Sequence, residues 1–335
     1  MKHLAFGPGA MGYFMYLGAL SALSDASALN ELVSISGASA GSILGLMYIL
    51  TKGDVQKALE YSLSIPIKTV MKPNIKVFLK SYGLVSAKKA RVIFETTTRL
   101  FMKTNDVTFA ELYAYWPVKL HVSACCIDLH TTHYFSVDTT PFMSVLDAVC
   151  MSISIPFLFQ SIQHGPWRYI DGGTLETIPC GPFIGEDPKN VLAFQIADVW
   201  DYNVKDLKSY ALCILGAAMT LREKYIMFPS IGLCATTIDT FDFSASDDAK
   251  LQLFTQGYSQ TKKSLCKVNA NDPACHQSAP DTQERNAHDV GLHDRGISTG
   301  APERARACHQ HGRSVPSDDS PSAQVGRASD QTEPA

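Results

Sequence analysis

Two short motifs that contain glycine hold residue types used in acyl transfer. The first is Gly37-Ala38-Ser39-Ala40-Gly41, which follows a predicted strand at Leu32 to Ser36 and precedes an apolar helix. A strand–turn–helix setting of this kind can hold a serine on a tight turn with its hydroxyl exposed, as a nucleophile requires. Gly37 and Gly41 would let the turn and the helix approach closely, because neither has a Cβ. The alternative is that Ser39 only caps the helix.

A serine nucleophile needs a base, and here the sequence offers a carboxylate. None of the five histidines before residue 267 follows Asp171, so the Ser, Asp, His order of an α/β-hydrolase is absent. Asp171 ends a predicted strand at Trp167 to Ile170, and Gly172 and Gly173 allow a tight turn after it. A partly desolvated Asp on a rigid turn can accept a serine proton directly. In isolation, Asp-Gly-Gly is more typical of a hairpin turn.

A glycine-rich loop, Gly7-Pro8-Gly9-Ala10-Met11-Gly12, lies between the first predicted strand and helix. It fits GxGxxG, but a dinucleotide site also needs an acidic residue after the second strand, where this chain has Ser36 and the serine turn. Backbone N–H groups of the loop would instead face an oxyanion at Ser39, because loops after neighbouring parallel strands share one sheet edge. Pro8 has no N–H, so the expected donors are those of Gly9, Ala10 and Ala40.

Periodicity and turn residues predict the elements that position these motifs. The first fifty residues read as a strand (His3 to Phe6), a helix to about Leu23, a strand (Leu32 to Ser36) and a helix to about Leu50, a unit that builds a parallel sheet. Further strands are predicted at Val118–Cys125, Thr132–Val137, Trp167–Ile170 and Val191–Ile196. Helices are predicted over most of 54–103, from Phe109, and at Met143–Met151, Leu207–Arg222 and Ala249–Cys266. Thr108, with Glu111 three residues on, predicts a capping box at the start of the helix at Phe109.

Composition divides the 335 residues into a body, 1–266, and a tail, 267–335. The tail has no aromatic residue, no Met and only six branched aliphatic residues, so we predict that it is disordered. It also carries the whole net charge of −3, and the body has 22 basic and 22 acidic side chains. A neutral body argues against a nucleic-acid partner. The nine cysteines form no CxxC pair, so neither a zinc site nor any other cofactor is expected.

Two uncharged runs, Leu4 to Leu23 and Leu32 to Leu50, are long enough for a signal peptide or membrane spans. Glycines, a proline and serines interrupt them, which lowers both apolarity and helix propensity. Cleavage of the first run would also remove the glycine-rich loop. We therefore expect an intracellular, cytoplasmic protein with peripheral membrane contact rather than a secreted one. The oligomeric state stays open.

The glycine-rich loop, GxSxG and the distant Asp-Gly-Gly resemble, in this order and spacing, the patatin-like phospholipases. Val145 to Phe159 and Leu253 to Tyr258 are similar to further segments of that family. The resemblance covers about residues 3–266 and implies a three-layer α/β/α sandwich with a mainly parallel sheet and lipid acyl hydrolysis without metal. It further implies that Ser39 is the nucleophile, that Asp171 is the base of a Ser-Asp dyad, and that the loop Gly7 to Gly12 is the oxyanion hole.

Departures from the family pattern keep more than one function open. The leading hypothesis is a phospholipase A-type serine hydrolase that cleaves acyl esters of membrane phospholipids. The family loop commonly carries a basic residue where this chain has Met11, which keeps open a hydrolase of neutral acylglycerols or lysolipids. Pro8 replaces a glycine, which keeps open a lipid-binding or membrane-anchored protein without catalysis. Glu176 to Pro179 stands where the family commonly has Asn residues before the proline, and this difference by itself indicates no function.

Overall fold

The computed structural model describes residues 1–72, 74, 76, 78–79, 82–197, 204, 209–210, 213–214, 228–236 and 238–270. Residues Met1–Ala279 belong to one compact unit, and all of the described residues lie in it. Most of the helix predicted at Leu207 to Arg222, and the predicted tail beyond residue 270, lie outside the described residues. The side chains of residues 267–270 are not described either.

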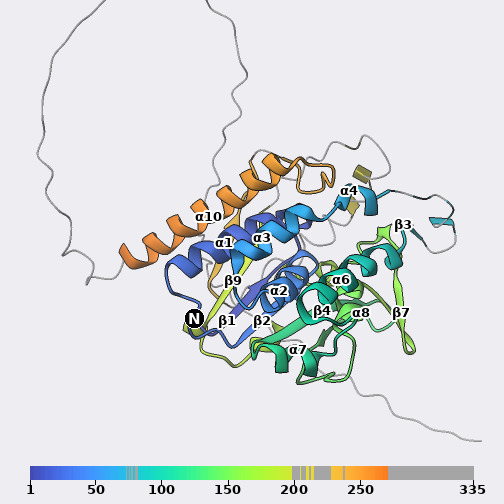
Figure 1. The fold of residues 1–335 in the computed structure, drawn as a ribbon, viewed down its shortest axis with the longest axis horizontal. Coiled ribbons are helices and arrows are strands. Elements are labelled where there is room, and N and C mark those ends of the chain that lie inside the picture. The colour runs from blue at the N-terminus through green and yellow to red at the C-terminus, as the bar shows by residue number, and fades with distance from the viewer. Residues whose placement is uncertain are drawn as a thin grey trace, which may run out of the picture. The chain divides into compact units, whose positions relative to one another are not determined.

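A mainly parallel sheet forms the centre of this unit (Figure 1). Its parallel part has the order β10, β9, β1, β2, β4, and β8 and β5 each pair antiparallel with β4, while β7 pairs antiparallel with β8. The strands are β1 (His3–Phe6), β2 (Ser34–Ala38), β4 (Lys119–Cys126), β5 (Thr131–Phe135), β7 (Ile162–His164), β8 (Trp167–Asp171), β9 (Val191–Ile196) and β10 (Ser230–Leu233). The predicted mixed α/β class with a mainly parallel sheet is confirmed.

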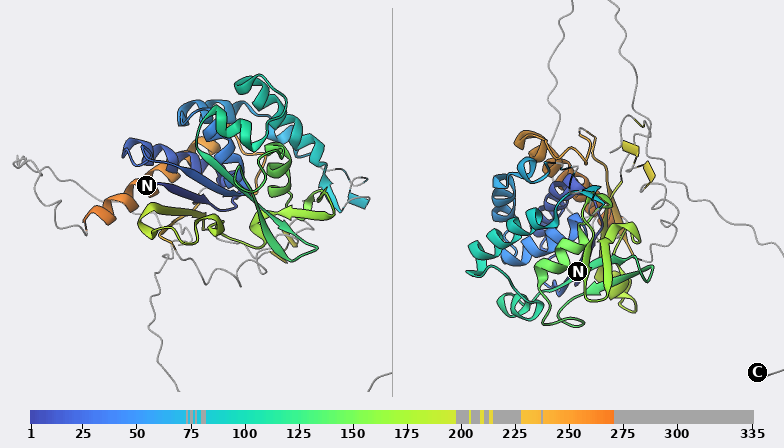
Figure 2. Two further views of the ribbon diagram at one scale, coloured as in Figure 1. Left: turned by 90° about the horizontal axis from the view of Figure 1, so that it is seen from below. Right: turned by 90° about the vertical axis from the view of Figure 1, so that its right-hand side faces the viewer.

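Helices flank the sheet, and Figure 2 shows the blue helices of the first fifty residues packed over one of its faces. The helices are α1 (Tyr13–Asp25), α2 (Ala40–Leu50), α3 (Val55–Ser64), α4 (Ile67–Val70), α6 (Ala87–Met102), α7 (Phe109–Tyr115), α8 (Val145–Ser152) and α10 (Asp247–Ala270). The predicted capping box of α7 is present, because Thr108 accepts from the Glu111 N–H and Glu111 accepts from the Thr108 N–H. The segment 54–103 is mostly helical, as expected, but it also contains a short strand, β3 (Gly83–Val85), which pairs with β6 (Phe157–Phe159).

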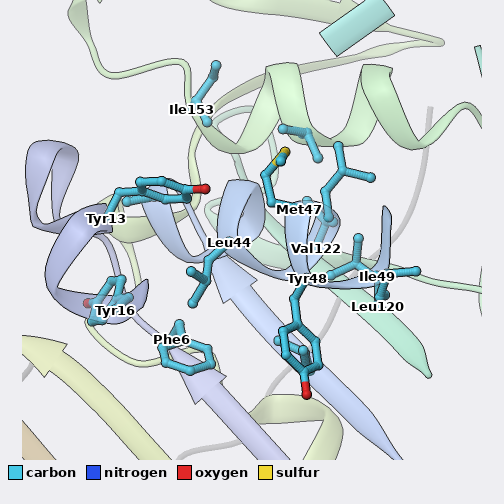
Figure 3. Packing of buried hydrophobic residues seen from close by; sticks show 14 of the residues in the cluster. Phe6, Tyr13, Tyr16, Leu44, Met47, Tyr48, Ile49, Leu120, Val122 and Ile153 are labelled. Atoms are coloured by element: carbon cyan, nitrogen blue, oxygen red, sulfur yellow. The ribbon is translucent and has the colours of Figure 1, made fainter. Parts of the chain in front are cut away.

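The two uncharged runs each fold as a strand followed by a helix, β1 with α1 and β2 with α2. Among the described residues, no helix combines the length and the apolarity that crossing a bilayer takes. Both helices are instead buried in the core, which explains why they are apolar on all sides. Figure 3 shows Leu44 of α2 pointing toward Phe6 of β1 and Tyr16 of α1. On its other side α1 packs along α10 (Figure 1).

Strand β4 brings two distant chain segments end to end. Ala38, the last residue of β2, lies opposite Ser123, and Asp171, the last residue of β8, lies opposite Ala124. Strand β5 pairs with β4 along 122–126, so β2 and β8 must share the other edge of β4. Because β2 runs parallel to β4 and β8 runs antiparallel to it, their carboxyl ends meet at adjacent residues of β4.

Candidate active site

Ser39 lies on a sharp turn between β2 and α2. Its backbone has φ 52° and ψ −118°, a conformation that is strained for a residue with a side chain. A Cβ on Gly37 would overlap the backbone of Gly41, and a Cβ on Gly41 would overlap the carbonyl oxygen of Phe6. Glycine is therefore required at both positions for the turn to pack against α2 and β1.

Neighbouring serines hold this turn in place. The Ser39 N–H donates to Ser152 Oγ at 2.9 Å, and Ser42 Oγ donates to the Ser39 carbonyl at 2.7 Å. Ser152 ends α8 and is fully buried, and its role was not apparent from the sequence. The one signal available was its place in the Val145 to Phe159 segment that resembles the family.

Asp171 ends β8 beside this turn. Its Oδ1 accepts from the Gly173 N–H at 2.8 Å, and its own N–H donates to the Ser154 carbonyl at 2.9 Å. Its Oδ2 is buried and has no hydrogen-bond partner of good geometry among the described residues. Ser152 and Ser154 therefore connect the end of α8 to both candidate catalytic residues.

Burial makes the Asp171 carboxyl a weaker acid than an exposed aspartic acid. Desolvation raises the pKa of this carboxyl from 3.8 to about 7, although the nearby Ser39 side chain and the hydrogen bond from the Gly173 N–H lower it in part. Ser39 and Asp171 are each only 4% exposed. The structure thus brings the two residues together, and it gives the carboxyl a pKa at which it can accept and return a proton near neutrality.

The glycine-rich loop lies next to both residues. Gly7 donates to the Phe194 carbonyl at 2.9 Å and Gly12 to the Gly9 carbonyl at 2.6 Å, so these two N–H groups are already engaged. Ala10 and Ala40 line the same cavity as Ser39. Pro8 packs on the Asp-Gly-Gly turn, because a Cβ on Gly173 would lie 2.6 Å from the Pro8 ring.

A cavity of about 150 Å³ lies beside Ser39, which is one of its lining residues, and its lining is almost entirely apolar. It continues from the serine turn between α1, α2, α4 and α6 as far as β6. Figure 3 shows three of the lining residues, Tyr13, Met47 and Ile153, which come from different parts of the chain. Tyr13 and Ser62 supply hydroxyls to the wall, but these bond to each other at 2.8 Å. The space suits a hydrocarbon chain better than a polar ligand.

No group of three or more His, Cys, Asp or Glu that could bind a metal occurs among the described residues. The arrangement of a buried serine, a carboxyl with a raised pKa and backbone N–H groups at a helix N-terminus can perform acyl transfer. An apolar cavity beside the serine is suited to an ester with a long acyl chain. Fold and site together therefore define an α/β protein whose candidate site is suited to acyl transfer from a lipid ester.

Sequence comparison identifies the particular family. The patatin-like phospholipase family matches residues 4–184, just over half of the chain, and the chain belongs to this family. A probable lipid hydrolase, 463L, of invertebrate iridescent virus 6 is 28% identical over 183 residues, which is 53% of this chain and 61% of that protein. An uncharacterized protein, R571, of Acanthamoeba polyphaga mimivirus is 26% identical over 195 residues, 57% of this chain and 64% of that protein. The match thus spans less than two thirds of either relative.

A solved structure supports the fold. VipD from Legionella pneumophila aligns with a TM-score of 0.56 and 16% sequence identity, over 79% of this chain and 67% of that one. At this identity the likeness concerns the arrangement of helices and strands alone. It agrees with the central sheet flanked by helices described above.

Proposed function

We propose that this chain is a serine lipid acyl hydrolase of the phospholipase A type, which cleaves fatty-acyl esters of membrane phospholipids. The observation that carries the proposal is that Ser39, which lies beside the buried Asp171, lines an apolar cavity. Membership of the patatin-like phospholipase family supports the same chemistry. In this proposal the cavity holds the acyl chain and the ester carbonyl lies at Ser39.

The reaction has two steps with Asp171 as the proton carrier. In the first, Ser39 Oγ bonds to the ester carbonyl carbon while Asp171 takes its proton, and the proton then passes to the alcohol oxygen as its bond to carbon breaks. In the second, Asp171 removes a proton from water, the resulting hydroxide attacks the acyl-enzyme, and the fatty acid leaves as Ser39 regains its proton. No third catalytic side chain is needed, since the carboxyl pKa of about 7 suits both directions.

The oxyanion of each tetrahedral intermediate would be held by backbone N–H groups. Ala10 and Ala40 support this role because they line the cavity at Ser39, and Gly9 is the third expected donor. Gly7 and Gly12 would shape the loop without donating, because their N–H groups bond to Phe194 and Gly9. Pro8 has no N–H to donate, but it is compatible with such a site because its ring packs on Gly173 and supports the Asp171 turn.

Labelling by a fluorophosphonate, together with fatty-acid release from phosphatidylcholine vesicles, tests the proposal. We expect wild type to react in both assays, Ser39→Ala in neither, and Ser64→Ala, which changes an exposed serine at the end of α3, to behave as wild type. Equal behaviour of wild type and Ser39→Ala would refute the mechanism. A chain that binds vesicles but is never labelled would be a lipid-binding protein without catalysis.

Met11 favours a second candidate substrate class. This apolar side chain lines the cavity where the family commonly has a cation, so the site has no charged side chain at that position for a phosphate. Neutral acylglycerols or lysolipids would then be the preferred esters. Rates on phosphatidylcholine, lysophosphatidylcholine and triacylglycerol, measured with the same acyl chain, distinguish these substrates.

We also propose that residues 3–266 form the catalytic domain. Helix α10, which packs along α1, lies almost wholly within this range. A chain that ends after Ala270 is therefore expected to keep the labelling rate of the full-length protein, and loss of labelling would show that the remaining residues belong to the enzyme.

A further inference from the structure

Positive charge is concentrated in one segment of the otherwise neutral body. Residues 61–94 contain six of the body's 18 lysines and one arginine, and no acidic residue. The arginine, Arg91, is neutralised, because it pairs with Glu95, Asp106 and Asp147. The lysines whose side chains are described are all exposed, and none of them forms an ion pair with a described residue: Lys68, Lys72, Lys76, Lys88 and Lys89.

This basic segment lies at the cavity that begins at Ser39. Val70 and Met71, just before Lys72, line the cavity, and so do Ala90 and Ile93 of α6, just after Lys89. In β3, which lies between them in the sequence, Val85 pairs with Phe159, another lining residue. Figure 1 shows α4 and β3 on the same side of the unit. The lysines are therefore attached to the walls of the proposed acyl-chain site.

Large apolar side chains are exposed in the same place. Leu79 is 75% exposed, Tyr82 is 70% exposed and Phe157 is 45% exposed. Tyr82 directly precedes Gly83, which pairs with Phe157 across the β3–β6 ribbon. Tyr82 and Phe157 both have positive φ, 60° and 68°, which is uncommon for aromatic residues. Single exposed apolar residues need no explanation, but aromatic and aliphatic groups amid unpaired lysines form the kind of surface that enters a lipid interface.

We propose that this surface, made of Lys68, Lys72, Lys76, Lys88, Lys89, Leu79, Tyr82 and Phe157, docks the protein on an anionic phospholipid bilayer. The proposal rests on the proposed function, because docking here would bring the part of the acyl-chain cavity wall formed by Val70, Met71 and Ala90 to the lipid surface. The lysines would contact the anionic headgroups, while Leu79, Tyr82 and Phe157 would enter the boundary between headgroups and acyl chains.

A lipid surface explains this combination better than an acidic protein does. The charge is carried by separate lysines on flexible stems, because Arg91, the arginine of this segment, is already paired with three carboxylates. Lysine suits a diffuse field of headgroup phosphates, whereas bidentate recognition of a carboxylate favours arginine. The exposed apolar residues lie beside a cavity that needs to receive a hydrocarbon chain. Each lysine close to an anionic surface strengthens binding about fivefold, so three of them contribute on the order of a hundredfold.

Vesicle flotation tests the proposal without relying on catalysis. The protein carries Ser39→Ala in every arm, and the vesicles are phosphatidylcholine alone or phosphatidylcholine with phosphatidylserine. We expect stronger binding to the vesicles that contain phosphatidylserine, weakened by added salt, and a loss of about a hundredfold in affinity for Lys72→Gln/Lys76→Gln/Lys89→Gln. The matched variant Lys189→Gln/Lys262→Gln/Lys263→Gln, which removes three exposed lysines from other elements, should bind as its parent does.

A separate variant, Leu79→Ser/Tyr82→Ser, tests the apolar residues of the surface. We expect it to bind vesicles more weakly than its parent at high salt, where the contribution of the lysines is screened. Equal loss in the two lysine triplets, or binding that ignores phosphatidylserine, would overturn the proposal. So would absence of vesicle binding together with salt-sensitive binding to polyglutamate, which would assign the surface to an acidic polypeptide. Hydrolysis of a soluble short-chain ester by the proteins with Ser39 restored reports on the active site alone. Its failure would refute the proposed function and leave the docking result unaffected.

Discussion

Replacing Asp171 with Asn should make the protein more stable at neutral pH while abolishing its proposed activity. The Asp171 carboxyl is buried, and its pKa is raised from 3.8 to about 7 by desolvation. Asn has nearly the same shape and can still accept from the Gly173 N–H, as Asp171 Oδ1 does. The substitution therefore removes an ionisable group from a site that disfavours its charge.

The sign and size of the effect follow from the two pKa values. Between about pH 4 and pH 7 the unfolded chain has lost the Asp171 proton while the folded chain retains it, so wild type loses stability as pH rises through this window. A difference of about three pH units at 1.36 kcal/mol per unit amounts to roughly 4 kcal/mol. Asn does not titrate, so the unfolding free energy of the variant should exceed that of wild type by almost nothing at about pH 4 and by a few kcal/mol at about pH 8.

Urea unfolding of wild type and Asp171→Asn across this pH range measures the difference in unfolding free energy. Glu31→Gln, which removes an exposed carboxylate in the loop before β2, is the matched control and should show little pH dependence relative to wild type. A difference between Asp171→Asn and wild type that does not change with pH would refute the reasoning. It would mean that the folded protein does not hold the carboxyl protonated.

Four further predictions concern activity and packing. On a soluble short-chain ester, kcat/KM should rise with pH and level off above an apparent pKa of about 7, because Asp171 must be ionised to act as base; a profile that is flat from about pH 5 to pH 8 would exclude it. Ser152→Ala leaves the buried Ser39 N–H without its acceptor, and a loss of about 1–2 kcal/mol in positioning should lower kcat roughly tenfold with KM little changed. Gly41→Ala should destabilise the fold by about 2 kcal/mol or more in urea unfolding, since its Cβ meets the Phe6 carbonyl, whereas Gly232→Ala, whose Cβ has 3.8 Å of space, should cost far less. Met47→Trp narrows the cavity, so the ratio of the hydrolysis rates of long-chain and short-chain esters should fall about tenfold or more. An unchanged ratio would show that the cavity does not bind the acyl chain.

The sequence predicted elements well where a local pattern determines them. His3–Phe6 and Val191–Ile196 are strands with the predicted bounds, and the capping box at Thr108 was read from two residues three positions apart. The β3–β6 ribbon was missed because each of its strands has only three residues, too few for a period-2 pattern to appear. Its pairing joins segments more than seventy residues apart, and no local rule connects them.

The two catalytic candidates were identified from motifs, but their meeting was not predictable from either motif. It depends on β2 and β8 pairing with the same edge of β4, so that their last residues lie opposite adjacent residues of β4. This pairing is tertiary and cannot be read from either motif alone. The role of Ser152 has the same origin, since a serine at the end of a helix has no sequence mark that points to a turn 113 residues away.

Glu176, whose departure from the family pattern indicated nothing in the sequence, also has a structural explanation. It accepts a hydrogen bond from the Tyr134 hydroxyl, which in turn accepts from the Gly181 N–H at 3.1 Å, and burial raises the Glu176 pKa. This connection holds the segment after Asp-Gly-Gly against β5. A Cβ on Gly7 would overlap the carbonyl oxygen of Thr177, so the same segment also packs on the glycine-rich loop. Glu176 therefore helps to hold the segment after Asp171 against both β5 and the glycine-rich loop.

Among the described residues that line the cavity at Ser39 there is no histidine, and the burial of Asp171 supplies a group with a similar pKa. A histidine serves as a general base because its ordinary pKa, about 6.5, lies near neutral pH. An exposed aspartate, with a pKa near 4, is too weak a base to take a serine proton efficiently. Full burial at the meeting of β2, β4 and β8 raises the Asp171 pKa to about 7, into the range of histidine. In the proposed mechanism this single carboxyl therefore carries the proton without a histidine. The stability that wild type loses between about pH 4 and pH 7 is the thermodynamic counterpart of this basicity, and the unfolding measurement and the pH–rate profile should therefore report the same pKa.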